Sequence, residues 1–407
     1  MAEQRILGLG FIGVGQAVAR IFQQYPDIEK LPYRFVAACD LRQHSLDRFE
    51  NQFGGRTYRN ALQLCLDPNV DVVYIATPPE MHKDHCLLAI ANGKHVIVEK
   101  PMALSLSDCR EMIEAADAQG VKLMAGHTHS FDAPIRKISE IVRSGDLGGV
   151  LMINSWNFND FNARPWPTSE LISTYGPLLN QGPHQIDIVR QIGGGVVRSL
   201  RGTTIWDESR QCIGGYSALL EFENGASASI SYDARAYFDT AELYGWVGEG
   251  GALRDPETNL RSRKNLDSLL HASDDLEKAL EEQKEHGRYG ASEPTPEMLK
   301  LWGYTLAENV IHQPFFGITV VSCERGAIRQ YSDGLIIYGA EGRTEIPLDR
   351  SMRGRAAELL ELYKGIVNDE PIFHDGRWGQ ATLEVCFAIL ESAENHADVS
   401  MIYQVPV

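Results

Sequence analysis

The sequence predicts an α/β domain with a doubly wound parallel sheet, followed by an α+β domain with a large, open and mostly antiparallel sheet. Over about the first 125 residues, short continuous apolar runs alternate with amphipathic segments, as strands buried on both faces alternate with helices. After about residue 150, strand-like segments follow one another closely, with turn signals between them. A length of 407 residues is also typical of two domains.

Strands and helices alternate throughout the predicted first domain, residues 1–126. The strands are Arg5–Leu9, Phe35–Cys39, Val70–Ala76, His95–Glu99 and Leu123–Ala125. The helices are Gln16–Gln24, Leu46–Phe53, His82–Asn92 and Leu106–Gln119. Because crossovers between parallel strands are right-handed, this order predicts helices on both faces of one sheet, which is the Rossmann arrangement.

The predicted second domain, residues 127–407, opens with strands in close succession. They are Val150–Trp156, Val197–Trp206, Ala218–Phe222, Ala226–Tyr232 and Glu242–Val247, with a hairpin turn at Glu223–Gly225. A further turn separates Leu335–Tyr338 from Thr344–Ile346. The charged run Asp274–Glu285 predicts a solvated surface helix. Two long amphipathic helices, Arg353–Ile366 and Gln380–Ala393, close the chain, and the second, at about residues 380–394, could pack back on the first domain.

The composition disfavours several classes of partner. A formal net charge of -17 argues against nucleic acid or an anionic membrane surface. The first residues do not have the pattern of a secretory signal, and no run of about 18 apolar residues occurs. The seven cysteines are scattered without a CxxC pair, as expected of free thiols in a reducing compartment. We therefore expect a cytoplasmic protein that acts on a small-molecule substrate.

A glycine-rich motif follows the first apolar run. Gly8-Leu9-Gly10-Phe11-Ile12-Gly13 matches the pattern GxGxxG at the point where a helix is expected to begin. In this pattern the first glycine permits a tight turn, the second lets the backbone approach a pyrophosphate, and the third lets helix and strand pack closely. N–H donors and the dipole at the helix N-terminus favour the phosphates. Gly8, Gly10, Phe11, Ile12 and Gly13 are therefore predicted to bind a dinucleotide, the alternative being a glycine-rich turn without a ligand.

An acidic residue ends the second predicted strand. Asp40 should hydrogen-bond the adenosine ribose hydroxyls. It follows Gly13 by 27 positions, longer than the usual spacing of about 20, so we expect the stretch Tyr25–Arg34 to be an inserted loop. Asp40 should repel the additional phosphate of NADP, whereas Arg42 could attract it. NAD is the predicted cofactor and NADP is less favoured; the alternative for Asp40 is a role only as a helix N-cap.

The next two strands end in residues suited to the cofactor edge of such a sheet. Thr77 and Pro78 would lie beneath the cofactor. His82 and His85 follow with a spacing that could hold a metal, but no third ligand is evident, so we expect helix-surface or cap residues, with His82 near the cofactor and no metal site. The fourth strand ends in Glu99-Lys100-Pro101, where a lysine amine could polarise a carbonyl or remove a hydroxyl proton.

Taken together, the GxGxxG, Ala76-Thr77-Pro78-Pro79 and Glu99-Lys100-Pro101 motifs resemble those of the Gfo/Idh/MocA family of oxidoreductases. The resemblance covers essentially the whole chain and implies hydride transfer between NAD(P) and a carbinol carbon, generally without a metal. It implies that Lys100 is the catalytic residue and that Glu99 lies with it at the cofactor. It also implies a homodimer or homotetramer paired through the second-domain sheet.

The second signature of that family, roughly DxGxHxxD, matches Asn180–Asp187. The match implies that His184 is a general acid–base or a substrate ligand, a role suited to an imidazole whose ordinary pKa of about 6.5 is close to working pH. Asp187 follows three residues later on the next helix and is a candidate substrate residue. Asn180 replaces the commoner Asp, and it can still hydrogen-bond a hydroxyl or the cofactor amide.

Further segments resemble the phthalate cis-dihydrodiol dehydrogenase branch of the family. They are Gly126–Phe131, Met152–Asn157, Asp160-Phe161, Arg164-Pro165 and Pro314–Gly326. These dehydrogenases oxidise a carboxylated cis-dihydrodiol to a catechol with NAD.

A carboxylated substrate would need a cationic partner, for which Arg164 is the best candidate, with Arg136 and Arg235 behind it. Other side chains could line the ring pocket. They are His127, His129, Trp156 and Asn157, with core packing as the alternative for Trp156.

Two other functions remain open. A sugar or inositol dehydrogenase of the same family would share Lys100 and His184 and differ in the polarity of its pocket. A non-catalytic dinucleotide-binding sensor is the alternative of another class, which the presence of both Lys100 and His184 disfavours.

Overall fold

A computed structural model describes residues 5–23, 28–126, 128–164, 175–285, 288–291 and 310–407. The chain divides into two compact units. Unit 1 comprises Met1–His127, Glu285–Glu293 and Ser351–Leu383, and unit 2 comprises Thr128–Lys284, Pro294–Arg350 and Glu384–Val407. The chain first passes from unit 1 to unit 2 between His127 and Thr128, within one residue of the boundary expected after residue 126. Two later segments also belong to unit 1, which a division into two contiguous domains does not anticipate.

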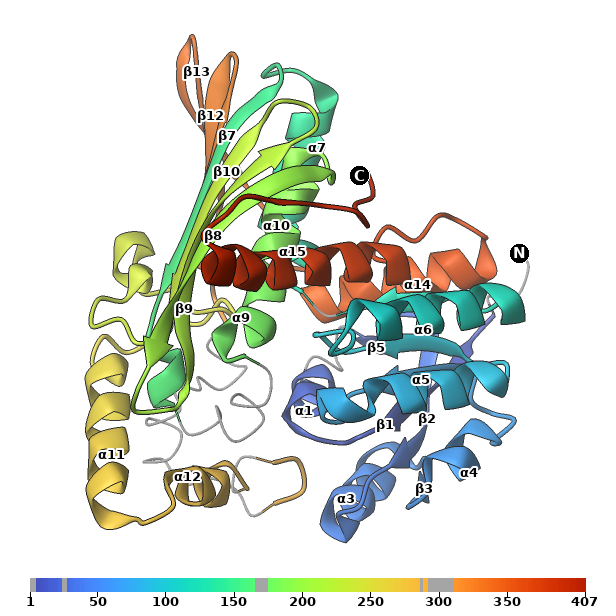
Figure 1. Cartoon of the computed structure of the whole chain (residues 1–407). Coiled ribbons are helices and arrows are strands. Elements are labelled where there is room, and N and C mark those ends of the chain that lie inside the picture. Colours follow the sequence, from blue (N-terminus) through green and yellow to red (C-terminus); the bar gives the residue numbers. More distant parts are fainter. Residues whose placement is uncertain (1–4, 24–27, 127, 165–174, 286–287, 292–309) are drawn as a thin grey trace. The chain divides into compact units, whose positions relative to one another are not determined.

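Unit 1 contains a six-stranded parallel sheet in the order β3-β2-β1-β4-β5-β6, the Rossmann order, which confirms the predicted fold class. The strands are β1 (Leu7–Ile12), β2 (Tyr33–Cys39), β3 (Arg56–Tyr58), β4 (Val72–Ile75), β5 (His95–Val98) and β6 (Leu123–Ala125). The helices of this part are α1 (Gln16–Gln23), α3 (Gln43–Phe53), α4 (Ala61–Cys65), α5 (His82–Ala91) and α6 (Leu106–Gln119). Figure 1 shows α5 and α6 side by side along the sheet.

Two short elements of unit 1 were not predicted. β3 has three residues and α4 has five, too few for a hydrophobic period to emerge from the sequence. The later segment adds α14 (Gly354–Val367) and the first part of α15 (Gly376–Asn395), which crosses the boundary between the units at Leu383. Within unit 1, Gly379 packs against Ala125 and Met102, so the start of this helix belongs to the first core.

The carboxyl ends of four neighbouring strands, β2, β1, β4 and β5, lie at one edge of this sheet. Backbone bonds join Gly13 N–H to Cys39 O (2.8 Å), Ala76 N–H to Ile12 O (2.9 Å) and Glu99 N–H to Ile75 O (2.9 Å). The strand order reverses between β1 and β4, and ligands of such folds bind outside the strand ends at that reversal. The turn that begins at Gly13 and the Glu99-Lys100-Pro101 turn therefore lie at the edge where a cofactor is expected.

Unit 2 contains a nine-stranded mixed sheet in the order β14-β13-β12-β11-β7-β10-β9-β8-β15. Among the described strands, β7 and β10 pair in parallel and the other pairs are antiparallel, which confirms the mostly antiparallel second sheet. The strands are β7 (Val150–Phe158), β8 (Val197–Asp207), β9 (Cys212–Phe222), β10 (Ser227–Asp233), β11 (Ile318–Cys323), β12 (Gly326–Tyr331), β13 (Gly334–Gly339), β14 (Gly342–Pro347) and β15 (Val399–Ser400). The helices are α7 (Ala133–Ser144), α9 (Pro177–Asn180), α10 (Gly182–Gly193), α11 (Thr258–Ala272) and α12 (Leu276–Glu285).

Helix α10 forms the core of unit 2, and all its residues are buried. The amide of Gln185 donates to Ser155 O (3.0 Å) and Ser231 O (3.2 Å), and its oxygen accepts from the Tyr216 hydroxyl (2.8 Å). These bonds join the helix to strands β7, β10 and β9. Side chains alternate along a strand, so one face of the sheet packs on α10 while the other carries exposed residues such as Trp156.

One sequence prediction for unit 2 was wrong. Glu242–Val247 was expected to be a strand, but Thr240–Tyr244 forms a 3₁₀ helix, with Asp239 accepting the Ala241 N–H at its N-cap (2.9 Å). This local side-chain contact outweighed the strand-like sequence pattern. The charged segment Asp274–Glu285 does form a surface helix, α12, of which Leu280 and Lys284 are buried and the other residues are at least partly exposed.

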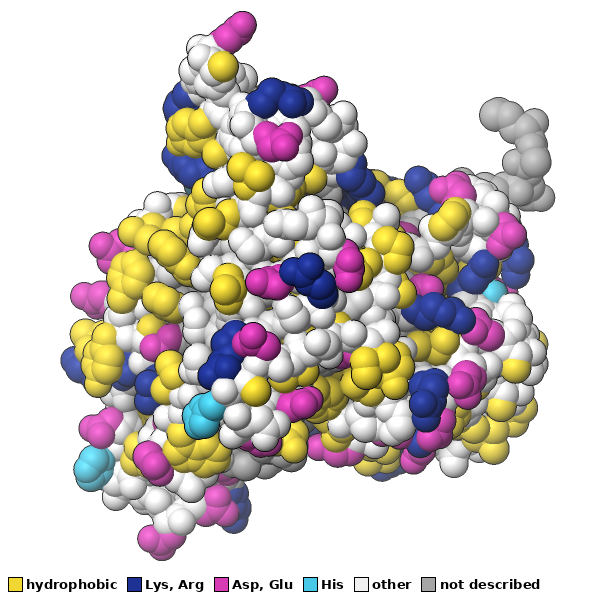
Figure 2. Space-filling model, turned by 45° about the horizontal axis from the view of Figure 1, so that its top comes forward, with side chains coloured by type: hydrophobic (Ala, Val, Ile, Leu, Met, Phe, Trp, Pro, Cys, Tyr) yellow, Lys and Arg dark blue, Asp and Glu magenta, His cyan; other side chains and the backbone are white. Residues whose placement is uncertain are grey.

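The surface carries charges of both signs. On the face shown in Figure 2, Lys and Arg side chains are interspersed with Asp and Glu side chains and with small hydrophobic areas. Within the described ranges, none of the helices has the length and apolar character that crossing a bilayer requires. All seven cysteines are buried free thiols, and burial raises the pKa of each, which keeps them protonated and unreactive.

Candidate active site

The turn after β1 has the geometry of a phosphate-binding loop. Gly13 adopts φ +87°, and a Cβ there would lie 2.7 Å from Ala76 O, so this position requires glycine. A Cβ at Gly15 would meet nothing within 4 Å, which leaves open space in front of the backbone just before α1 begins at Gln16. Open space beside a helix N-terminus suits a pyrophosphate, so these residues fit a dinucleotide.

This geometry corrects the predicted position of the glycine motif. Gly8, Gly10, Phe11 and Ile12 lie inside β1 and are buried, so their backbone is not at the phosphate turn. A Cβ at Gly8 would lie 1.8 Å from Asn69 O, and one at Gly10 would press on Leu64 and Val70. These two glycines allow close packing within the sheet.

The turn is therefore Gly13-Val14-Gly15, with Val18 at the third position of the motif. Asp40 follows Val18 by 22 positions, close to the usual spacing of about 20. Most of the excess length attributed to an inserted loop thus came from placing the motif five residues too early.

Gly15→Ala is expected to leave the fold intact and to weaken NAD binding about tenfold or more, because the added methyl enters the space left for the pyrophosphate. Calorimetric titration with NAD and a thermal unfolding curve measure the two effects separately. Gly250→Ala, at another glycine with open space, is the matched control. Gly13→Ala should instead lower the unfolding temperature. NAD affinity unchanged by Gly15→Ala would contradict this position of the loop.

The carboxylate of Asp40 fastens the end of β2 to the glycine turn. Its Oδ2 accepts the Val14 N–H (2.7 Å) and its Oδ1 accepts the Arg42 N–H (2.9 Å). Each carboxylate oxygen has a second lone pair, so the group can still accept from ribose hydroxyls. The N-cap of α3 is Arg42 and not Asp40, so the alternative of a helix cap alone does not apply.

His82 connects the turns that follow β4 and β5. Its Nδ1 lies 2.9 Å from Pro101 O, and its Nε2 lies 2.9 Å from Thr77 O. The expectation that His82 is a helix-surface residue was wrong, because it is buried at the start of α5, and burial lowers its pKa. Thr77 Oγ1 also lies 3.2 Å from His85 Nδ1. These contacts hold Thr77, Pro78 and the backbone beside Lys100 together at the cofactor edge.

Glu99 points into a buried charge network. Its Oε1 accepts from Arg355 Nη2 (2.8 Å) and from the Tyr74 hydroxyl (3.0 Å), and Tyr74 accepts in turn from Arg355 Nη1. Burial alone would raise the pKa of Glu99, but the Arg355 guanidinium holds it below its usual value. The predicted contact between the Glu99 side chain and the cofactor is therefore not supported, because this carboxylate is committed to an interior arginine.

The same network contains a second carboxyl group, Glu358, 3.5 Å from Arg355 Nη1. Burial raises the pKa of Glu358 to about 8, more than the guanidinium lowers it. In the unfolded chain the group ionises near its ordinary value, about 4.3. Its contribution to stability is therefore fully present below that value and is lost as the pH rises towards 8.

Glu358→Gln should raise the unfolding temperature at pH 8 and change it little at pH 5, since it removes a titration that costs about 1.4 kcal/mol per pH unit. A gain of several degrees at pH 8 is expected. Calorimetric scans at half-unit steps measure it, with the exposed Glu50→Gln in the same unit as the control. A constant difference between variant and unchanged protein across pH 5–8 would show that Glu358 is ionised throughout.

Unit 2 contains a separate group of candidate residues, in which two imidazoles and a phenyl ring lie together. The ring of His184 lies 4.9 Å from that of His129 and 5.1 Å from that of Phe316, and His129 stacks on Phe316 at 4.8 Å. His129 Nδ1 contacts Asp132 Oδ2 at 2.7 Å. Two of the predicted substrate residues are thus brought together. Phe316 was missed as a site residue, although it belongs to the segment Pro314–Gly326 that marked the resemblance.

The Asp187 carboxylate bonds to the two residues that flank His129. Its Oδ2 accepts from the hydroxyls of Thr128 and Ser130, the two residues on either side of His129. Asp187 is almost completely buried, and its contact with the substrate stays a prediction. Asn180 accepts from the neighbouring Gln181 side chain (2.8 Å).

Asn157 and Trp156 lie on opposite faces of β7. Asn157 is buried and accepts from Asn159 Nδ2 (2.9 Å), which also contacts the Tyr232 hydroxyl (3.1 Å). The Tyr232 ring stacks towards Phe316, with 6.3 Å between the ring centroids. Through Asn159 and Tyr232, Asn157 is thus connected to the rings of Phe316, His129 and His184. Trp156 is 45% exposed on the other face, which contradicts both roles expected of it, in the core and in the ring pocket.

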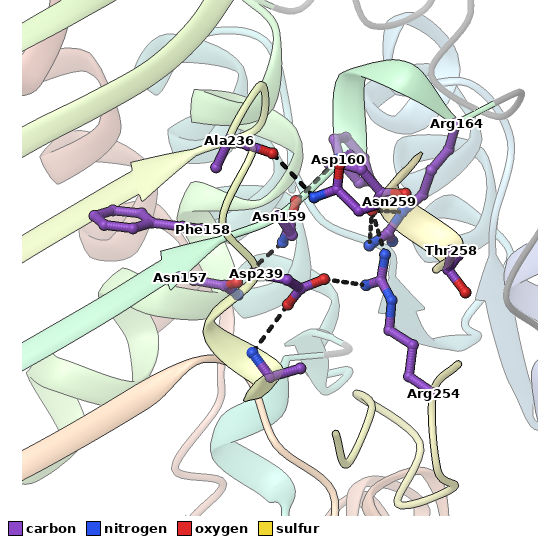
Figure 3. Close-up of polar contacts among 12 residues, drawn as sticks. Asn157, Phe158, Asn159, Asp160, Arg164, Ala236, Asp239, Arg254, Thr258 and Asn259 are labelled. Carbon is purple, nitrogen blue, oxygen red and sulfur yellow. Dashed lines mark hydrogen bonds and ion pairs between the residues drawn. The ribbon is translucent and has the colours of Figure 1, made fainter. Parts of the chain in front are cut away.

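Arg164 belongs to a buried cluster of two arginines and two aspartates (Figure 3). Its Nε and Nη2 both lie 2.9 Å from Asp160 Oδ1, which also accepts from Arg254. Arg254 Nη1 lies 3.3 Å from Asp239 Oδ2. Burial alone would raise the pKa of Asp160, but Arg164 and Arg254 hold it well below its usual range. Arg254, which sequence reasoning missed because no motif marks it, contributes as much charge here as Arg164.

Arg136 and Arg235 were the other candidates for a cationic partner, and His127 was a candidate for the ring pocket. Arg235 lies 3.8 Å from Asp233 and donates to Trp206 O (3.3 Å), and Arg136 is a partly buried residue of α7. His127 lies outside the described residues. Among the described side chains, no three of His, Cys, Asp or Glu are grouped as metal ligands.

Comparison with known proteins gives matches over both units. Residues 5–127 match the GFO_IDH_MocA description "Oxidoreductase family, NAD-binding Rossmann fold", and residues 135–254 match "GFO/IDH/MocA C-terminal domain". A relative from Comamonas testosteroni, 1-carboxy-3-chloro-3,4-dihydroxycyclohexa-1,5-diene dehydrogenase, is 34% identical over 95% of this chain and 94% of its own length. A myo-inositol 2-dehydrogenase from Thermotoga maritima is 29% identical over 52% of this chain and 65% of its own.

The fold also matches solved structures. A putative dehydrogenase from Bordetella bronchiseptica superposes with a TM-score of 0.86 at 31% identity, over 97% of this chain and all of that one. These likenesses extend well beyond the glycine turn and include the mixed sheet of unit 2.

Proposed function

Because the chain belongs to the Gfo/Idh/MocA family of NAD-binding oxidoreductases, we propose that it oxidises a carboxylated cyclic cis-dihydrodiol to the corresponding catechol. The observation that carries this proposal is the similarity, over nearly the whole chain, to the Comamonas relative. The name of that protein describes a ring with one carboxyl and two hydroxyl groups. A substrate of that class would need an acid–base group, a flat apolar wall and a cation.

Lys100 is the proposed base. NAD bound at the carboxyl edge of unit 1 would accept the hydride from the carbinol carbon. As the C–H bond breaks, the neutral Lys100 amine takes the hydroxyl proton, and the carbinol becomes a ketone. The ring ketone then tautomerises to an aromatic diol, which makes the oxidation favourable. Arg355 already pairs with Glu99, so this neighbouring carboxylate keeps a partner while the lysine changes its charge.

His184 is the proposed second acid–base or substrate-binding group. Its ring lies beside those of His129 and Phe316, and Asp187 accepts from the hydroxyls of the residues on both sides of His129. A phenyl face next to two imidazoles suits a planar ring that bears hydroxyl groups. We propose that these rings, with Asn157 and Asn180, bind the substrate ring and its second hydroxyl.

We propose that the substrate carboxylate binds at the arginine cluster. Tyr232 connects the two groups, since it stacks towards Phe316 and contacts Asn159, the residue before Asp160. Arg164 and Arg254 are held by Asp160 and Asp239, so the cluster carries no large excess of positive charge. A substrate carboxylate would therefore share guanidinium N–H groups with Asp160. We expect the cluster to contribute more to selectivity for carboxylated substrates than to the affinity for them.

The proposal predicts NADH formation with carboxylated cis-dihydrodiols and NAD. The assay follows absorbance at the reduced-nicotinamide band with four candidates: the carboxylated dihydrodiol, the same ring without the carboxyl group, myo-inositol, and a simple aldose. We expect kcat/KM to be at least tenfold higher with the carboxylated ring than with its uncharged analogue. Turnover of inositol or sugar in preference would identify a polyol dehydrogenase, and NAD binding without turnover of any candidate would support a sensor.

We also propose that the protein works as a homodimer or homotetramer. The face of the unit 2 sheet opposite α10 carries apolar side chains that are at least two-fifths exposed. They are Met152 and Trp156 of β7, Ile205 of β8 and Leu219 of β9. Exposed apolar side chains on an extended, flat surface are typical of an interface between copies of one chain.

A cytoplasmic location is proposed on the chemistry of the cysteines. All seven are unpaired and buried, as suits a compartment that keeps thiols reduced. We expect the substrate to be a small molecule dissolved in the same compartment.

A further inference from the structure

A short segment that is distant in sequence from the Rossmann strands lies against α3 in unit 1. The carbonyl of Tyr289 accepts from the Ser45 hydroxyl (2.6 Å), and the Tyr289 hydroxyl donates to Gln52 (2.7 Å). The Tyr289 ring packs on Phe22 at 4.8 Å. Gly290, with φ +86°, fits where a Cβ would lie 2.7 Å from His44 O. The segment is therefore built to rest on this helix, and we refer to Glu285 and Arg288–Ala291 as the return segment.

The first residue of the return segment holds Arg42. Glu285 Oε1 accepts from Arg42 Nε at 3.1 Å, and Arg42 Nη1 lies 3.6 Å from Asp40 Oδ1. The other oxygen of Glu285 contacts Arg288. The Arg42 guanidinium thus faces two carboxylates, one from the end of β2 and one from a position 243 residues later in the chain.

Arg42 is the residue near Asp40 best placed to recognise an additional phosphate. It follows by two residues the carboxylate expected at the ribose hydroxyls, where the 2′-phosphate of NADP would lie. A guanidinium binds phosphate with two parallel hydrogen bonds. Arg59, the next cation along, already donates to Leu41 O (2.8 Å) and Gln43. Arg48 lies over the Tyr289 ring.

We propose that Glu285 is a specificity-determining residue for the cofactor, which excludes NADP by holding the Arg42 guanidinium and by adding a negative charge beside the 2′-position. Asp40 alone repels the phosphate, and the salt bridge with Glu285 withdraws the cation that could compensate. The role of the return segment is to carry this carboxylate to the adenosine end of the site. The inference rests on the dinucleotide site of unit 1 and not on the identity of the substrate.

The test measures binding of NADP and NAD by calorimetry at low salt, without substrate. Glu285→Gln should tighten NADP binding about tenfold, since it releases Arg42 and removes one like charge at close range, and should leave NAD binding within about twofold. Glu282→Gln, on the same helix and exposed, makes the same charge change away from Arg42 and should leave both affinities unchanged. Thermal unfolding confirms that each variant folds.

The double variant Arg42→Gln/Glu285→Gln separates the two contributions. If Arg42 carries the gain, the double variant loses most of the NADP affinity that Glu285→Gln acquired. NADP affinity unchanged in Glu285→Gln, or equally improved by Glu282→Gln, would overturn the proposal. Glu285→Asp, which keeps the charge and shortens its reach, should show an intermediate gain. NAD titration of the unchanged protein checks the cofactor site itself, and the dehydrogenase assay checks the proposed reaction. A failure of the inference on Glu285 is therefore distinguishable from a failure of either.

Discussion

Lys100→Met is expected to lower kcat by three to four orders of magnitude and to leave NAD binding within about twofold. A positioned proton acceptor contributes about 10²- to 10⁴-fold to such reactions, and methionine keeps the shape of the side chain without the amine. Single-turnover absorbance measurements give the chemical step, and calorimetry gives the affinity for NAD. Lys137→Met, on the surface of α7, is the matched control and should change neither.

A second substitution at this position distinguishes proton transfer from charge. Lys100→Arg keeps the positive charge but cannot accept a proton, because a guanidinium does not deprotonate in proteins. If Lys100 is the base, the arginine variant is as inactive as the methionine variant. If arginine restores most of the activity, the lysine acts by charge alone, and full activity in the methionine variant removes it from the mechanism.

His184→Asn is expected to lower kcat/KM about a hundredfold and to change the pH profile. As a base in the oxidation, the imidazole must be neutral, so activity should fall towards acid pH, and the variant should lose that limb. The measurement is kcat/KM from pH 5 to 9 with one carboxylated substrate. His271→Asn, at an exposed position on α11, is the control.

His184→Phe tests the structural alternative. Phenylalanine preserves the ring contacts with His129 and Phe316 but has no ring nitrogen. A phenylalanine variant that retains the rate and the profile of the unchanged protein would show that His184 only packs. Loss of the low-pH limb in both variants would support an acid–base role.

Some of this organisation could be read from the sequence, because it leaves local patterns. The runs Val70–Ala76 and His95–Glu99 predicted strands of the parallel sheet, where β4 and β5 are found. The motifs identified Lys100 and His184 as candidates, and their roles stay predictions. The glycine motif was recognised but displaced, since Gly8, Gly10, Gly13 and Gly15 lie so close together that two registers fit. Only the positive φ of Gly13 and the open space at Gly15 decide between them.

Contacts between distant segments left no such pattern. His82 was expected to be a helix-surface residue, because nothing in the sequence of its own helix predicts that its ring contacts the carbonyls of Thr77 and Pro101. Arg254 and Glu285 lie in a stretch with no motif, and their partners Asp160 and Arg42 are far away in sequence. Asp187 and Phe316 belong to recognised segments, yet their packing on the histidine group depends on the folded arrangement.

The interleaving of the two units means that no single cut releases the nucleotide-binding half intact. A fragment ending at residue 127 would lack Arg355, and Glu99 and Tyr74 would lose the guanidinium that pairs with them. It would also lack the Leu359 carbonyl that accepts from the Tyr33 hydroxyl at 3.0 Å. A buried carboxylate stripped of its cation costs several kcal/mol, a large part of the stability of a domain this size. Limited proteolysis should therefore degrade the protein without leaving a long-lived N-terminal piece.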